Sequence, residues 1–218
     1  MSEIRAVLFD LYDTLVYSDW PLLRAEMERR FGLDEKALIR AFVETRRARS
    51  VGTFGSAEED LRAVLDAAGV APSDDIIHDY LVRFRSEGIH LWEDSLPTAR
   101  ALRERGIRTA IVSNCDHSTR PAVEELGLVE EFDAVILSFE VRAAKPDPEI
   151  YEAALRAVDV PAADALFVDD QARYCEGAIA VGMRSMLILR DDAAPAEGVS
   201  EPGSLEVLFD LRTVLERI

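Results

Sequence analysis

Three short segments, far apart in the chain, each end an apolar run with a side chain that is reactive or charged. The polar residues that close these runs are, in chain order, Asp10, Ser113 and Asn114, and Asp169 and Asp170. An uninterrupted apolar run of about four to eight residues is typical of a strand buried on both faces of a parallel sheet. Because ligands bind at the carboxyl ends of such strands, we expect one crevice to gather all three segments. The sequence therefore predicts an enzyme site.

The residue types at these positions suit attack on an anionic substrate. Asp10 can act as a nucleophile on phosphorus or carbon and form an ester, which water then cleaves. Lys145, which lies in a segment with two prolines, can neutralise both this carboxylate and the substrate. Ser113 and Asn114 offer a hydroxyl, an amide and backbone N–H groups that can bind an oxyanion.

Asp169 and Asp170 indicate which reaction class is favoured. With Asp10 they place three carboxylates in one crevice against a single lysine, and like charges this close cannot all stay ionised without a cation. Paired carboxylates, a backbone carbonyl and waters are the ligands that Mg²⁺ prefers. We therefore predict a Mg²⁺ site formed by Asp10, the Tyr12 carbonyl and one or both of Asp169 and Asp170. Asp170 has an alternative role as the N-cap of the helix that follows it.

Four motifs together resemble those of the haloacid dehalogenase-like hydrolase superfamily. In chain order they are Phe9-Asp10-Leu11-Tyr12-Asp13-Thr14-Leu15, Ser113-Asn114, Lys145-Pro146-Asp147-Pro148 and Val168-Asp169-Asp170. Each motif is weak alone, but their order and spacing over nearly the whole chain make the resemblance specific. The resemblance implies a hydrolase that forms an aspartyl ester with its substrate, with Asp10 as the nucleophile.

Tyr12 departs from the pattern of the superfamily's phosphatases. Those enzymes carry a second aspartate at this position, which protonates the leaving group, whereas haloacid dehalogenases carry a tyrosine. A phenol with a reference pKa of about 10 can donate a proton but is a poor base near neutral pH. Asp13 can replace the missing carboxylate only if the backbone turns, because adjacent residues of an extended strand point to opposite faces.

Two other residues match the dehalogenases. Arg40 stands where those enzymes keep a substrate-binding arginine in the cap, and Tyr151 matches a tyrosine that those enzymes also have. Against this, the dehalogenase segment that corresponds to Asp169-Asp170 is typically uncharged, and those enzymes use no metal. The acidic pair therefore favours a metal-dependent phosphatase, whereas Tyr12 favours a dehalogenase.

Apolar periodicity indicates the elements that must position these residues. The apolar run within residues 4–10 predicts the first strand. In residues 17–92, apolar residues recur at helical spacing and glycines interrupt the pattern. After residue 93, helices and strands alternate, which is typical of a parallel sheet with helices on both sides. We predict an α/β fold: a Rossmann-like core of residues 1–16 and 93–218, with an inserted all-helical cap of residues 17–92. The expected core elements are helices 95–105, 118–126, 147–158 and 173–181, strands 107–113, 133–138, 164–168 and 184–189, a loop 191–203, and a terminal helix capped by Ser204.

Composition restricts the partners and the compartment. The 218 residues include 25 basic and 42 acidic side chains, a net charge of −17, which disfavours nucleic acids and anionic membranes as partners. No apolar stretch approaches the ~20 residues that a membrane helix needs, and the charged N-terminus shows no secretory signal. Two cysteines, Cys115 and Cys175, form no disulfide framework, so we expect a reduced, cytoplasmic location.

These observations predict a cytoplasmic, Mg²⁺-dependent phosphohydrolase, monomeric or homodimeric, that acts on a small phosphorylated metabolite. The expected catalytic residues are Asp10, Tyr12 and Lys145, and the expected substrate-binding residues are Thr14, Ser113, Asn114 and Arg40. Cap residues such as Trp20, Arg24, Arg46 and Arg47 are expected to select the substrate. Two alternatives stay open: a metal-independent 2-haloacid dehalogenase, and a catalytically weak protein that binds a phosphorylated ligand.

Overall fold

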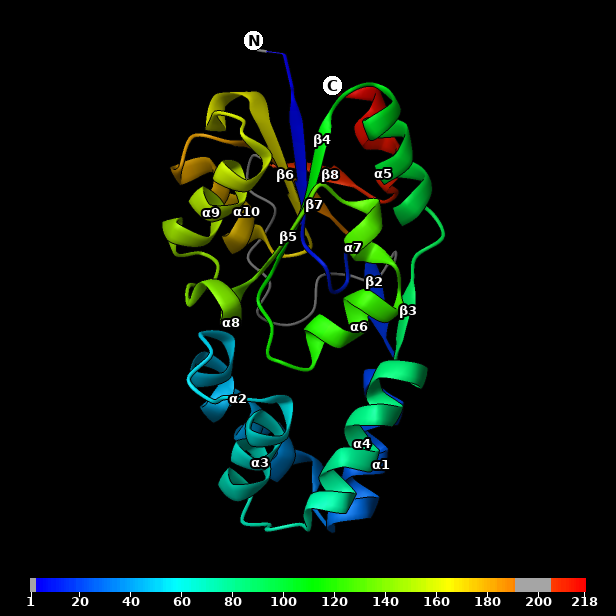
Figure 1. Cartoon of the computed structure of the whole chain (residues 1–218), viewed down its shortest axis with the longest axis vertical. Helices are drawn as coiled ribbons and strands as arrows, with labels where there is room; N and C mark the ends of the chain where they lie inside the picture. Colours follow the sequence, from blue (N-terminus) through cyan, green and yellow to red (C-terminus); the bar gives the residue numbers. More distant parts are fainter. Residues whose placement is uncertain (1–2, 191–204) are drawn as a thin grey trace.

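A six-stranded parallel sheet forms the centre of the molecule (Figure 1). The computed structural model describes residues 3–190 and 205–218. In the order β5-β4-β1-β6-β7-β8, the strands are Ala134–Leu137, Arg108–Ser113, Ala6–Phe9, Ala165–Asp169, Arg184–Ile188 and Glu206–Leu208. The predicted Rossmann-like α/β core is therefore confirmed.

Helices cover both faces of this sheet. Side chains of β1 alternate between two apolar clusters, with Val7 and Phe9 in one and Ala6 and Leu8 in the other. The first cluster includes residues of α5 (Ser95–Glu104), α6 (Thr119–Glu125), α7 (Leu128–Glu131) and the 3-10 helix η2 (Leu211–Glu216). The second includes residues of α9 (Pro148–Val158) and α10 (Ala172–Ala180), which lie on the opposite side in Figure 1. Burial on both faces explains why β1 has no polar residue.

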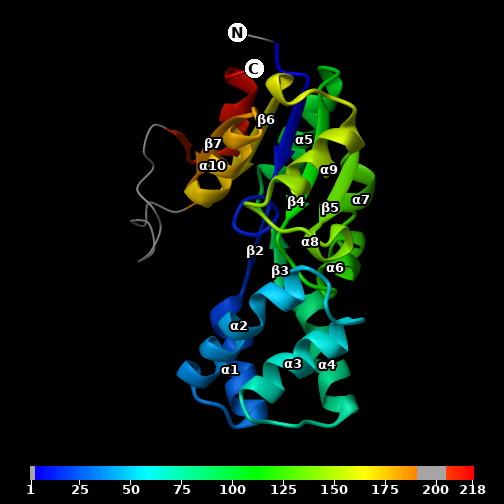
Figure 2. The same cartoon turned by 90° about the vertical axis from the view of Figure 1, so that its left-hand side faces the viewer.

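Four helices between β1 and β4 form a separate layer at the carboxyl ends of the strands (Figures 1 and 2). They are α1 (Trp20–Phe31), α2 (Glu35–Ser50), α3 (Ala57–Ala67) and α4 (Asp74–Glu87). Their apolar faces meet in a cluster of their own, which includes Met27, Leu38, Leu65 and Ile77. Ser56 begins α3 by accepting a hydrogen bond from the Glu59 N–H, as expected of an N-cap serine.

The expectation that residues 17–92 are entirely helical is wrong at both ends of this range. Strand β2 (Val16–Ser18) pairs antiparallel with β3 (Ile89–Leu91), and this ribbon joins the helical layer to the core. Three-residue strands are too short to show an alternating apolar pattern, which explains why periodicity did not reveal them.

The C-terminal region and one core helix also differ from the expected elements. Ser204 and the expected loop 191–203 lie outside the described residues. In place of a terminal α-helix, the structure has strand β8, which extends the sheet beside β7, followed by the 3-10 helix η2. The expected helix 118–126 is followed by a separate turn, α7, because Gly127 has a φ of 69° and ends the first helix. Two further short helices, α8 (Ser138–Val141) and η1 (Ala162–Asp164), precede α9 and β6.

In the part of the chain that the structure describes, no helix combines the length and apolar character needed to cross a membrane.

Asp94 and Arg190 form a buried ion pair that ties several core elements together. Arg190 Nη1 donates to Asp94 Oδ2 at 2.6 Å, and the Leu211 N–H donates to the same oxygen at 2.8 Å. Arg190 Nε also donates to the Thr14 carbonyl at 3.0 Å. Burial alone would raise the pKa of Asp94, but the hydrogen bonds from Arg190 and Leu211 outweigh it and lower the pKa. The pair therefore stabilises the loop that follows β1.

We expect the substitution Asp94→Asn to lower the free energy of unfolding by about 3 kcal/mol at pH 7, because it leaves a buried arginine without its counterion. Since the folded protein lowers the pKa of Asp94, this carboxylate adds stability above the unfolded-state pKa of about 3.9. It loses that contribution as the pH falls through the folded value. Urea denaturation at pH 7 and below pH 4 measures the free energy of unfolding of wild type and variant. The difference between the two proteins should be smaller below pH 4 than at pH 7. Asp66→Asn, an exposed carboxylate on α3, is the control; an equal deficit at both pH values would contradict the assignment.

Candidate active site

The carboxyl ends of three neighbouring strands bring the predicted residues together. Asp10 directly follows β1, Ser113 ends β4 and Asp169 ends β6. Strands β4 and β6 flank β1, with Phe9 in register with both Ile111 and Val168. The Asp10 N–H donates to the Val168 carbonyl at 2.9 Å, so the backbone of β6 fixes the start of the loop. One crevice therefore does gather these segments.

Lys145 joins two of the carboxylates from the loop before α9. Its Nζ lies 2.6 Å from Asp10 Oδ1 and 2.6 Å from Asp169 Oδ2. Nζ also lies 5.0 Å from the ring centre of Tyr174 and 5.4 Å from that of Phe167. Burial would lower the pKa of Lys145, but the attraction of Asp10 and Asp169 outweighs it and raises the pKa above its ordinary value. The lysine is therefore a fixed positive charge against the carboxylate expected to attack.

Asn114 holds the lysine in place. Its Oδ1 accepts a hydrogen bond from the Lys145 N–H at 2.7 Å, and its Nδ2 donates to the Lys145 carbonyl at 2.8 Å. Asn114 also lines the cavity beside Asp10. The sequence predicts substrate binding by Asn114, whereas in the structure one donor and one acceptor of its amide position Lys145.

The third carboxylate, Asp170, completes an acidic cluster. One oxygen from each of Asp10, Asp169 and Asp170 lies within 4.8 Å of the others. Burial, more than any neighbouring charge, raises the pKa of Asp10 and the pKa of Asp170 above the ordinary range of a carboxyl group. Asp170 Oδ1 is buried and has no hydrogen-bond partner among the described residues. The N–H of Gln171 is bound by Asp169 Oδ1, at 2.8 Å, rather than by Asp170.

This cluster fits a divalent cation. A buried carboxylate oxygen without a donor is costly, and three carboxylates against one lysine leave an excess of negative charge. A hard cation with oxygen ligands would satisfy both requirements. The observation that supports the fit is the unpartnered Asp170 Oδ1 inside the cluster.

The two predicted hydroxyl groups have different surroundings. Ser113 lines the cavity, and its buried Oγ has no hydrogen-bond partner in the described part of the chain, so it is free to donate to an oxyanion. Thr14 is fully buried and is not among the residues that line the cavity. Its Oγ1 likewise has no hydrogen-bond partner among the described residues, and its carbonyl is held by Arg190, so Thr14 helps to fix the loop after Asp10.

Tyr12 and Asp13 both line the cavity beside Asp10. The Tyr12 hydroxyl lies 3.1 Å from Thr119 Oγ1. Burial is the main cause that raises the pKa of Tyr12 above its ordinary value, so the phenol stays protonated. Asp13 has a φ of 57°, and this left-handed turn interrupts the extended backbone. The turn that Asp13 needs in order to reach the cleft is therefore present.

Helix α2 of the inserted layer supplies the opposite wall of the cleft. The cavity has a volume of about 500 Å³, and its lining includes Val43, Arg46, Arg47 and Ser50. These positions follow the i, i+3, i+4, i+7 spacing of one helix face. Arg40, on the same helix, is exposed and is not among the lining residues, so the structure does not bring it to the site.

Other cap residues named from the sequence are divided between the site and the surface. Arg47 Nη2 lies 2.8 Å from Asp147 Oδ2 in the segment that carries Lys145. Arg24 forms ion pairs with Glu28 and Glu35 and is not part of the lining.

Comparisons with known proteins agree with this geometry. Residues 4–182 match the family of haloacid dehalogenase-like hydrolases. The chain belongs to this family. It is 30% identical to phosphatase MT3486 of Mycobacterium tuberculosis (strain CDC 1551 / Oshkosh), over 95% of this chain and 98% of that protein. It is 27% identical to (S)-2-haloacid dehalogenase 1 of Pseudomonas sp. (strain CBS-3), over 87% of this chain and 86% of that one.

A comparison with solved structures shows a shared fold. The crystal structure of a HAD phosphatase from Thermococcus onnurineus matches with a TM-score of 0.71 and 21% identity, covering 98% of this chain and 97% of that one. As a haloacid dehalogenase-like hydrolase, the protein is an enzyme that cleaves its substrate with water, and phosphatases are among its relatives.

We expect Asn114→Ala to lower kcat by about 100-fold, because release of both Lys145 backbone groups lets the lysine shift and small misplacements cost about this much. Asn114→Asp keeps the bond from the Lys145 N–H but not the bond to its carbonyl, so its loss should be smaller. Steady-state kinetics with the best substrate of the wild type checks this. A rise in KM at unchanged kcat would instead show that Asn114 contributes mainly to uniform substrate binding.

Proposed function

We propose that the protein is a Mg²⁺-dependent phosphohydrolase that acts on a small phosphorylated metabolite through an aspartyl phosphate on Asp10. The observation that carries this proposal is the cluster of Asp10, Asp169 and Asp170, of which Lys145 bridges only two. Attack of a carboxylate on a phosphoryl group brings two anions together, and a cation must offset their repulsion. Displacement of a halide from carbon has no such requirement and needs no third carboxylate.

The residues of the cleft have distinct roles in this proposal. Asp10 attacks phosphorus, and Lys145 stabilises the charge that gathers on the phosphoryl oxygens. The free hydroxyl of Ser113 donates to one of these oxygens, while Asn114 keeps the lysine in place. Mg²⁺ would be held by Asp10, the Tyr12 carbonyl, Asp169 and Asp170, and when bound it supplies positive charge beside the phosphoryl group.

The inserted helices act as a cap in this proposal. Residues of α2 form the cleft wall opposite Asp10, so this layer limits the access of water and contacts the substrate. We also propose that the enzyme works in the cytoplasm on a free small molecule, as a monomer or homodimer. The net charge of −17 and the two buried, unpaired cysteines support this setting.

A metal-independent 2-haloacid dehalogenase is the second candidate. Tyr12 at the position of the missing aspartate favours it, and so does the 27% identity to the Pseudomonas dehalogenase. In this alternative, Asp10 attacks carbon and Lys145 alone balances the carboxylate.

A panel of acetyl phosphate, aryl and alkyl phosphates and 2-haloacids, each with Mg²⁺ and with EDTA, separates these candidates. We expect phosphate release that requires Mg²⁺ and stops in EDTA, because loss of the cation restores a repulsion of a few kcal/mol at an effective dielectric of about 20. Asp10→Asn is the blank, since an amide cannot form the ester.

Each alternative has its own signature in this panel. Halide release from a 2-haloacid that continues undiminished in EDTA would select the dehalogenase. Binding of a phosphate analogue without turnover of any compound would indicate a catalytically weak relative. Phosphate release by Asp10→Asn near the wild-type rate would exclude the aspartyl phosphate.

We expect Tyr12→Asp to raise turnover of alkyl phosphates by about 10- to 10⁴-fold, the range that a positioned acid or base contributes. The added carboxylate can protonate alkoxide leaving groups, which the wild type handles poorly, so acyl and aryl phosphates should gain less. Tyr12→Phe, which removes the hydroxyl near Thr119 but keeps the ring, is the matched control and should show no gain.

Mg²⁺ affinity must be measured beside kcat for both variants, because a new carboxylate next to Asp10 adds negative charge to the metal site. If Tyr12→Asp binds Mg²⁺ normally but loses alkyl-phosphatase activity, Tyr12 is itself a favourable part of the site. That result would favour the dehalogenase alternative.

A further inference from the structure

A second cavity lies beside the one that holds Asp10, between the cap and the core. Its volume is about 330 Å³. Four residues line both cavities: Tyr12, Arg46, Ser50 and Asn114. A substrate can therefore place one end at Asp10 and extend into this second space.

The walls of the second cavity are mainly apolar and aromatic. Side chains from all four cap helices contribute: Trp20, Phe42, Leu61, Val64, Tyr80, Leu81 and Phe84. Trp20 and Phe42 meet edge to face, with ring centres 5.1 Å apart. An apolar cavity of about 150 Å³ is large enough to hold benzene, so this one can accept a ring with a substituent.

Two of the charged residues that line the second cavity are paired with each other. Arg49 Nη1 lies 2.6 Å from Asp116 Oδ2, and the guanidinium stacks over the Phe42 ring. Arg46 differs, because it lines both cavities and has no ion-pair partner in the described part of the chain. A single unpaired cation is thus available where the two cavities meet, which is where an ester oxygen would lie.

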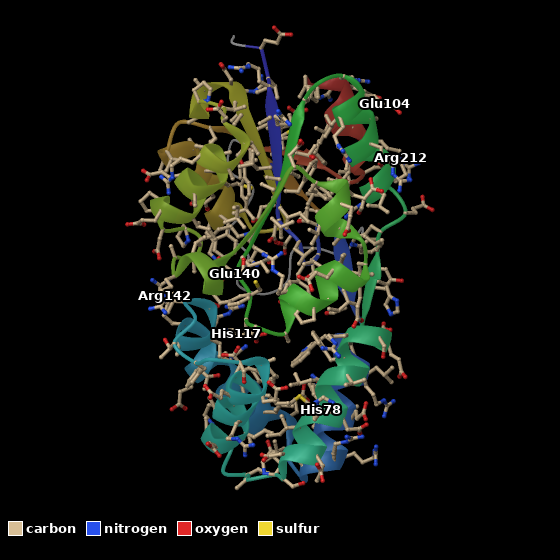
Figure 3. All side chains as sticks on the ribbon, viewed as in Figure 1. His78, Glu104, His117, Glu140, Arg142 and Arg212 are labelled. Carbon is tan, nitrogen blue, oxygen red and sulfur yellow. The ribbon has the colours of Figure 1, made fainter. Side chains whose placement is uncertain are left out.

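Asp60 is the polar exception inside the cap. It comes from α3, is only 2% exposed and lines the second cavity. Its Oδ2 accepts a hydrogen bond from the backbone N–H of His117 at 3.0 Å and also lies 2.7 Å from His117 Nδ1. His117 is labelled in Figure 3, where the core meets the cap. Asp60 Oδ1 has no hydrogen-bond partner within the described residues. A buried carboxylate oxygen of this kind is normally satisfied, which indicates a donor on a ligand.

We infer that the second cavity binds the leaving group of a phosphate monoester, and that this group is an aromatic ring bearing a hydroxyl that donates to Asp60. The inference rests on the proposed phosphatase activity and names its substrate class. A bond forms between an Asp10 oxygen and phosphorus as the bond from phosphorus to the aryl oxygen breaks. The aryl oxygen keeps the electron pair, leaves as a phenolate and takes a proton from solvent.

Tyr12 supports the choice of an aryl ester independently of the cavity. At the position where phosphatases of the family have the aspartate that protonates the leaving group, this site has Tyr12, whose hydroxyl lies 3.1 Å from Thr119 Oγ1. A phenolate is a good leaving group that needs little help from an acid. The chemistry at Tyr12 and the aromatic lining therefore select the same substrates.

The test compares two aryl phosphates that differ in one donor: 4-(hydroxymethyl)phenyl phosphate and 4-methylphenyl phosphate, with acetyl phosphate as the reference. We expect the Mg²⁺-loaded wild type to prefer the hydroxymethyl compound by about tenfold or more in kcat/KM, the effect of a hydrogen bond to a charged group. Asp60→Asn should lose this preference, and Asp66→Asn on the same helix should keep it.

A second test fills part of the cavity with Ala57→Phe. This variant should lower the ratio of aryl to acetyl phosphate turnover by about tenfold; Ser18→Phe serves if Ala57→Phe does not fold.

The outcomes distinguish this inference from the proposed function. The inference would be overturned if the enzyme hydrolysed acetyl phosphate but did not prefer 4-(hydroxymethyl)phenyl phosphate, and if the filling variants left the ratio of aryl to acetyl phosphate turnover unchanged. The proposed phosphatase function would still stand. If no phosphate ester is hydrolysed, the proposed function fails, and calorimetry with the free phenols still tests the cavity. Tighter binding of 4-(hydroxymethyl)phenol than of 4-methylphenol in wild type but not in Asp60→Asn would support it, and equal or absent binding would overturn it.

Discussion

The buried contact of Lys145 with Asp10 and Asp169 is the interaction on which the rest of the site depends. Removing three charged groups from water is costly, and their attraction repays the cost only where the geometry is closely fixed. Adjacent parallel strands fix the two carboxylates, and Asn114 fixes the lysine backbone. Tyr151, which matches a tyrosine of the dehalogenases, packs against Phe167 and donates to the Tyr174 carbonyl; it thus supports the two rings beside the ammonium group.

The cap is held over this site by contacts of a different kind. Arg47 pairs with Asp147, Arg49 with Asp116 and Asp60 with His117, so α2 and α3 are each linked to loops of the core. The exposed Arg47–Asp147 pair contributes little free energy, whereas the Arg49–Asp116 and Asp60–His117 pairs are more deeply buried. The inserted helical layer therefore has an apolar cluster of its own and is linked to the core by these three pairs.

The strand ends could be predicted because a parallel sheet leaves little freedom. Once residues 6–9, 109–112 and 165–168 are recognised as buried strands, their carboxyl ends must meet at one edge, and Asp10, Ser113 and Asp169 do so. The partners of side chains could not be predicted in this way. Residue type alone does not show that the Asn114 amide would bind the Lys145 backbone, or that Thr14 would be absent from the cavity lining. Short elements such as β8 carry too few residues to reveal a period.

The cap shows why substrate recognition is harder to predict than chemistry. A stripe of residues at helical spacing includes positions 40, 43, 47 and 50, but the stripe does not reveal which end of the helix faces the sheet. In the structure it is the C-terminal half of α2 that lines the cleft, so Arg46 and Arg47 lie at the site and Arg40 does not.

Asp60 offered no signal at all, because an acidic residue in the first turn of a helix is ordinarily a solvated group that complements the helix dipole. Only the packing of α3 against the core buries it beside His117, and that packing depends on contacts between segments far apart in the chain. The reaction class therefore follows from local motifs, whereas the substrate depends on how the cap docks.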